Sequence, residues 1–207
     1  MSRFSRIVVC ITALASLFAI TSSTAGAVTW TNSGGTSFHA TGGSVSLSLG
    51  GNLLGCSGST TVGDAPVGTF TGAVYSISGT ITYTPCSLIG NAAEMGCNFQ
   101  WTGATWTDGA PAISSGAVDL TCVYRLATTG TPICHIAGTT PAHYYNPTAT
   151  VPGRFTFTAS TTLVATSASG TSCSAFGVPS GGSAPVGLNE NTITIGSVAT
   201  SPFLTHS

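Results

Sequence analysis

Residues 154–165 read RFTFTASTTLVA, and this stretch lies between Cys134 and Cys173. Most apolar side chains occupy odd positions and most hydroxyl side chains occupy even ones, with Thr161 and Val164 as exceptions, and this period of two is typical of a β-strand with one buried face. The expected core face holds Phe155, Phe157, Ala159, Leu163 and Ala165. Cys173 shares this parity, so we expect two long strands that are tied by an inward-facing disulfide between Cys134 and Cys173.

The rest of the chain has the same character. Gly, Thr and Ser are abundant, only 4% of residues are charged, and sustained helical periodicity is missing from the sequence. Such a composition favours short strands and tight turns. Strands are expected at residues 29–31, 36–40, 44–49, 53–56, 69–75, 76–84, 97–101, 118–124 and 191–195, with a frayed end at Phe203, and a short helical turn within 87–96.

About ten strands in one domain of about 180 residues predict an all-β fold, an antiparallel sandwich or barrel with three disulfides. A β-solenoid is the alternative, although the chain shows no fixed repeat period.

Residues 1–27 have the features of a cleaved secretory signal peptide. Arg3 and Arg6 precede an apolar run over 7–20, and small residues at 25–27 suit cleavage before Val28. The run is shorter than the roughly 20 residues that span a bilayer, so an uncleaved anchor is the weaker alternative. We therefore expect a single domain at 28–207, secreted or at the cell surface, with no membrane attachment after cleavage.

Residues 28–207 contain two Arg, no Lys and five acidic residues, a formal charge of −3 with neutral His. A chain with two positive charges lacks the basic surface that nucleic acid requires, so nucleic acid is not an expected partner.

Cys10 leaves with the signal peptide, and six cysteines remain, which allow 15 connectivities. Their spacing does not suit zinc. Cys97 and Cys122 lie symmetrically about Gly109, and Cys134 and Cys173 about Gly153, which are both candidate turns. Sequential pairing follows as the prediction: Cys56–Cys86, Cys97–Cys122 and Cys134–Cys173.

Parts of the chain resemble a broad group of small secreted proteins of actinobacteria. The shared residues are glycine, aromatic, threonine and cysteine placements at 38–42, 54–56, 138, 145–146, 155–157, 163–164 and 169–173. The resemblance implies an exported β-rich domain with paired cysteines, and it carries no activity and no catalytic residue. Cys97 and Cys122 are additional to the pattern of this group.

The sequence offers little for catalysis, and we expect a protein that is not an enzyme and has no cofactor or metal. A G-x-S-x-G nucleophile motif is missing. Glycoside hydrolysis needs two opposed carboxylates, whereas Asp64 and Asp108 lie in expected turns and Asp119 alternates with apolar neighbours. His39, His135 and His143 are far apart in the sequence and are more often surface residues than metal ligands.

Two function classes remain. A Thr- and Ser-rich, nearly uncharged, disulfide-tied domain suits a structural or surface-associated role, with cell-wall contact or self-association through strand edges that few charges protect. The alternative is a carbohydrate-binding module in which exposed aromatic rings stack on a glycan. The candidate stacking residues are Trp101, Trp106, Tyr144 and Tyr145, and the first two face the same way only if a turn or bulge lies at Gly103.

Overall fold

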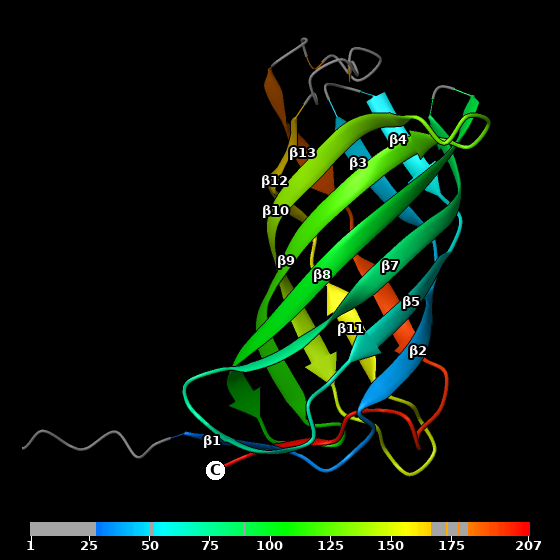
Figure 1. Ribbon diagram of the computed structural model, residues 1–207. Coiled ribbons are helices and arrows are strands. Elements are labelled where there is room, and N and C mark those ends of the chain that lie inside the picture. Colours follow the sequence, from blue (N-terminus) through cyan, green and yellow to red (C-terminus); the bar gives the residue numbers. More distant parts are fainter. Residues whose placement is uncertain (1–27, 50–51, 89, 167–172, 174–177, 179–181) are drawn as a thin grey trace, which may run out of the picture.

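The computed structural model describes residues 28–49, 52–88, 90–166, 173, 178 and 182–207, and the expected signal peptide lies outside these residues. Fifteen strands account for most of the described chain, and every pairing between them is antiparallel (Figure 1). The predicted all-β antiparallel fold is therefore confirmed.

Eight strand positions follow one another around the molecule, each paired with the next along the chain. Four are long single strands: β7 (Tyr75–Leu88), β8 (Asn91–Thr107), β9 (Ile113–Leu126) and β10 (Pro132–Tyr145). The other four each consist of two short strands in succession: β2 (Ser37–Gly42) and β3 (Val45–Leu49), β4 (Asn52–Cys56) and β5 (Ser59–Asp64), β11 (Arg154–Phe157) and β12 (Ser160–Thr166), β13 (Ser183–Leu188) and β14 (Asn191–Ile195).

The hydrogen-bonded ladders close into a ring, which selects the barrel rather than the sandwich or the solenoid. In the lower half of Figure 1 the ring runs β2, β5, β7, β8, β9, β10, β11, β14 and back to β2. In the upper half β4, β3, β13 and β12 complete it between β7 and β10. A closed antiparallel sheet has no unpaired strand edge.

A row of breaks crosses one side of this ring, and we call it the bulge row. It consists of residues 43–44, 57–58, 158–159 and 189–190 between successive short strands, and of a register shift in β7 between Tyr83 and Cys86. Buried side chains occupy even positions in β2 (Phe38, Ala40) but odd positions in β3 (Val45, Leu47). The register is kept across the paired breaks, since Gly42 is opposite Ser59 and Val45 is opposite Cys56, whereas the extra residue in β7 relative to β8 is a β-bulge, which bends that strand.

The structure corrects three sequence expectations about strand continuity and helical content. Residues 154–165 do not form one strand, and Ala159 in the break is exposed, although Phe155, Phe157, Leu163 and Ala165 are buried as expected. Splitting four long strands raises the number above the expected ten. The expected helical turn within 87–96 is wrong, because these residues end β7 and begin β8.

A small three-stranded sheet lies against the lower end of the barrel (Figure 1). Its central strand β1 (Thr29–Asn32) pairs with β15 (Leu204–His206) on one side and β6 (Gly68–Thr71) on the other. Trp30 of β1 is fully buried and contacts the rings of Tyr75, Trp106 and His206. The small sheet thus contributes its own aromatic side chain to the core.

Side-chain amides fasten the C-terminal segment to the barrel. The Asn146 Nδ2 group donates a hydrogen bond to the Leu204 carbonyl at 2.6 Å, and the Leu204 amide donates to Asn146 Oδ1 at 3.0 Å. The Asn146 side chain therefore satisfies both the backbone amide and the backbone carbonyl of Leu204, as a neighbouring β-strand would.

All three disulfides are buried inside the barrel. Cys56 is directly opposite Cys86, and Cys97 is directly opposite Cys122, each pair with a Cα–Cα distance of 3.9 Å. Cys134 of β10 bonds to Cys173, which follows β12 in the chain, at a Cα–Cα distance of 5.2 Å. Three disulfides in a chain of this size are typical of an oxidising, extracellular-like environment.

Glycines make room for the large rings of the core. A Cβ atom at Gly63 of β5 would lie only 2.2 Å from Cζ of the buried Phe38, whereas a Cβ at Gly96 of β8 would meet no atom within 4 Å. The first glycine is thus required by packing and the second is not.

We predict that Gly63→Ala lowers the free energy of unfolding by about 1–3 kcal/mol, because the added methyl group overpacks the core. The matched change Gly96→Ala should be neutral or stabilise by up to about 1 kcal/mol through the unfolded state. Denaturant midpoints at unchanged m-value measure both. Equal effects of the two substitutions would contradict this packing account.

Candidate functional site

Two of the four candidate stacking residues lie inside the barrel. Trp101 of β8 and Tyr144 of β10 are both 0% exposed, with ring centroids 6.1 Å apart. Both pack on Phe155, and the Tyr144 hydroxyl donates to the Pro202 carbonyl at 2.6 Å. The expectation that they stack on a glycan is therefore wrong for this conformation, because their faces are covered by other core rings.

Trp106 faces the same side of β8 as Trp101, because the bulge anticipated at Gly103 is present. The register with β9 shifts between Gly103 and Thr105. Trp106 consequently packs edge-on against Trp30 at 6.2 Å and parallel to His206 at 6.4 Å, and its Nε1 group donates to Asp108 Oδ1 at 2.7 Å. Its ring is partly buried in the lower end and does not form a platform with Trp101.

Tyr145 is the remaining candidate, and it lies on the outer wall. Arg154 of β11 is directly opposite, with its guanidinium carbon 4.2 Å from the centroid of the Tyr145 ring. His143 lies two residues earlier on the same face, and its Nδ1 atom is 2.8 Å from the Ser115 hydroxyl. We call Ser115, His143, Tyr145 and Arg154 the Tyr145 patch. It combines an aromatic ring, a cation and hydrogen-bonding groups, although the cation–π contact occupies one side of the ring.

The Ser115–His143 contact does not amount to a catalytic triad. A triad needs an acid that orients the histidine and donors that stabilise an oxyanion. Asp119 faces outward between buried neighbours, as expected, and accepts a hydrogen bond from the Thr139 hydroxyl, while Asp108 is engaged with Trp106.

The histidines suggested by the sequence are also dispersed. His39 lies on β2, whereas His135 and His143 lie on β10. In the lower ring, β11 and β14 lie between β10 and β2. Among the described residues, no group of three or more His, Cys, Asp or Glu side chains could hold a metal ion.

A cleft of about 580 Å³ lies at the bulge row, and sequence reasoning missed it. Val45, Pro85 and the Cys56–Cys86 disulfide supply apolar surface, and the polar lining includes Glu190. The remaining polar residues of the lining are Ser44, Ser46, Ser57, Ser87 and Asn189. Residues that point outward and residues that point into the core line the same hollow, because the strands are interrupted there. The change of apolar parity between 38–40 and 45–47 was the sequence signal for it.

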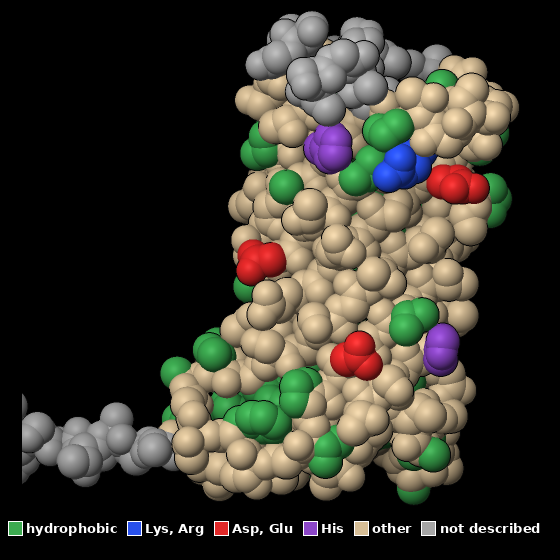
Figure 2. Space-filling view, viewed as in Figure 1, with side chains coloured by type: hydrophobic (Ala, Val, Ile, Leu, Met, Phe, Trp, Pro, Cys, Tyr) green, Lys and Arg blue, Asp and Glu red, His purple; other side chains and the backbone are tan. Residues whose placement is uncertain are grey.

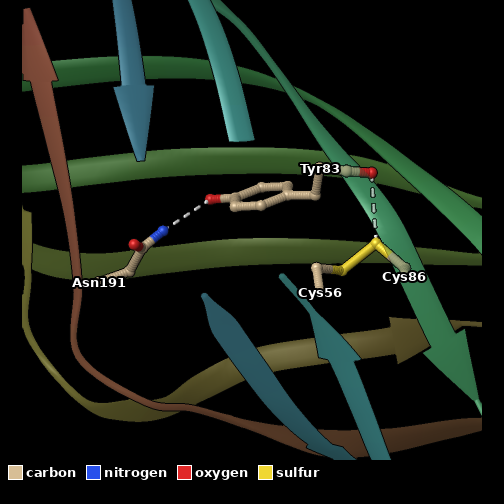
Figure 3. The surroundings of a disulfide bond; sticks show 4 residues. All are labelled: Cys56, Tyr83, Cys86 and Asn191. Carbon is tan, nitrogen blue, oxygen red and sulfur yellow. Dashed lines mark hydrogen bonds between the residues drawn. A yellow bond between two sulfur atoms is a disulfide. The ribbon is translucent and has the colours of Figure 1, made fainter. Parts of the chain in front are cut away.

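The core side of the Cys56–Cys86 disulfide carries a buried polar pair (Figure 3). Asn191 Nδ2 donates to the Tyr83 hydroxyl at 3.4 Å, and Cys86 Sγ lies 3.2 Å from the Tyr83 carbonyl oxygen. Burial raises the pKa of Tyr83 to about 12, since the phenolate would lose its hydration.

Comparisons with protein-family models, curated proteins and solved structures found no match to this chain. Within the part of the chain that the structure describes, no helix has the length and apolar character needed to cross a membrane.

The tyrosines predict an alkaline limit to stability. Burial raises the pKa values of Tyr75, Tyr83 and Tyr124 to about 12 and that of Tyr144 further, against about 10 in an unfolded chain. The unfolded state therefore loses these protons first, so stability is complete below pH 10 and falls between about pH 10 and 12.

Denaturant titrations at pH 8, 10 and 11 should show this fall, by up to about 1.4 kcal/mol per pH unit for each tyrosine. Tyr83→Phe, which keeps the ring, should reduce the pH dependence. Phenolate absorbance from all five tyrosines near pH 10 in the folded protein would contradict the prediction.

Proposed function

We propose that this protein is a secreted, non-catalytic structural or surface-associated domain. The observation that carries the proposal is a closed, disulfide-tied barrel that is filled with aromatic side chains and has a nearly uncharged wall. Figure 2 shows few charged side chains on the face in view, one basic group beside an acidic one and the other acidic groups apart, and the outward positions of its strands are mostly Ser, Thr, Gly and Asn. Such a body is a rigid spacer or surface module, because its interior offers its aromatic groups to no ligand.

Export is the first component of this proposal. The signal-like segment at 1–27 and the buried disulfides support it, as does the resemblance to secreted actinobacterial proteins. The resemblance also supports a role outside the cell.

Expression of the whole chain in an actinobacterial host tests the proposal. We expect the product in the culture fluid or the cell-wall fraction, with Val28 at its N-terminus and no free thiol by alkylation. Panels of esterase, protease and glycosidase substrates should give no turnover. A product that keeps residues 1–27 in the cytosol, or substrate turnover that purified protein retains, would overturn it.

Carbohydrate binding is the second candidate, and the Tyr145 patch favours it. Tyr145 is the one proposed stacking residue on the outer wall, and Arg154, His143 and Ser115 around it can hydrogen-bond to hydroxyl groups. The bulge-row cleft, with its serines and Glu190, is another place where a hydroxyl-rich ligand could bind.

Affinity gels that carry immobilised polysaccharides separate these possibilities. If the Tyr145 patch binds a glycan, Tyr145→Ala should abolish retention, while Tyr145→Phe and Glu190→Gln keep it. Loss in Glu190→Gln alone would assign binding to the cleft. Unretained wild-type protein on every gel would remove carbohydrate binding as a candidate.

A further inference from the structure

Self-association through strand edges depends on which edges are free. The ring of the barrel is closed, so its eight positions offer none. In the described part of the chain, the open edges belong to the small lower sheet, where β6 and β15 each pair only with β1. The sequence suggested that any strand of the uncharged wall could pair with another chain. Among the described strands, only β6 and β15 have an open edge for such pairing.

The β6 edge is surrounded by exposed apolar side chains. Val67 just before the strand is 49% exposed and Val74 just after it is 48% exposed, and Phe70 within it is partly exposed. Pro66, Phe70, Val74 and Tyr75 line a hollow of about 230 Å³ beside the strand. We call residues 66–74 the β6 edge segment. Figure 2 shows hydrophobic side chains gathered at this lower end of the molecule, in contrast to the wall above.

Charges that would keep such an edge apart from others are missing from its sequence. Asp64 is the last charged residue before the segment and Glu94 is the next, so residues 65–93 carry neither acid nor base. Natural proteins protect exposed edges by keeping the strand short, as β6 is with four residues, or with lysine, proline, inward-pointing charges or bulges. The β6 edge segment has exposed apolar side chains where such protection is expected.

We propose that the β6 edge segment binds the same segment of a second copy of this chain. Antiparallel pairing of β6 with β6 about a two-fold axis satisfies the free backbone groups of both strands and covers the valines of both copies. Because the segment is uncharged, two copies approach without electrostatic repulsion, and the free backbone donors and acceptors of one β6 edge match those of the other. β15 is less suited, since it has three residues against four in β6.

This inference rests on the proposed structural role and names the surface by which the domain assembles. A two-fold contact closes at a dimer, which gives a pair of barrels joined at their lower ends rather than an open filament. The upper ends then point away from the contact.

Sedimentation equilibrium of the exported protein across a concentration series tests the interface. We expect a monomer–dimer equilibrium for the wild type and at least a tenfold weaker dimer for Val67→Lys, because the added ammonium group would lose water in the contact, beside the 72–74 end of the second copy's segment. Val62→Lys is the matched control, since Val62 is also 49% exposed but lies on β5 in the closed wall. Thermal melts establish that each variant is folded, and Val74→Lys is the second variant should Val67→Lys not fold.

A wild type that stays monomeric at every concentration would overturn the interface. Equal weakening by Val67→Lys and Val62→Lys, or undiminished dimerisation in both edge variants, would do the same. The proposed function is tested separately, by finding the protein in the culture fluid or the cell-wall fraction. A failure of the dimer interface can therefore be told apart from a failure of the proposed function.

Discussion

Closure of the hydrogen-bond ring is the constraint on which the rest of this structure depends. Because every position pairs with the next along the chain and the last returns to the first, inward side chains are enclosed on all sides. Enclosure explains why Trp101, Tyr144 and Phe155 pack on one another. It also explains why the strands of the barrel, in a chain with almost no charge, offer no open edge to other chains.

The bulge row is where this closed wall departs from regularity. Four adjacent positions break at the same level, and β7 shifts register beside them, so the bends are accommodated together rather than one strand at a time. The break exchanges the inner and outer faces between β2 and β3, and it leaves the cleft above the Cys56–Cys86 disulfide. Both unusual features of the wall, its hollow and its parity change, therefore have one physical cause.

The proposed functions depend on the outside and the lower end of the barrel rather than on its core. The aromatic rings that suggested ligand stacking are mostly structural, and Tyr145 with its cationic neighbour is the exception. The lower end combines the open strand edges of the described chain with exposed valines, which makes it the natural place for contact with a second copy.

The sequence by itself determined the all-β class and the facing of single strands, because alternation is a local property. Phe155, Phe157, Leu163 and Asp119 each face as their neighbours in sequence indicated. Strand continuity, closure and burial of the tryptophans were decided only by tertiary structure, because they depend on register between distant strands. Ala159 is exposed since it lies in the break between β11 and β12, and Trp106 joins Trp30 since the bulge between Gly103 and Thr105 turns it. Alternation within one strand carries no information about which strand comes to lie beside it.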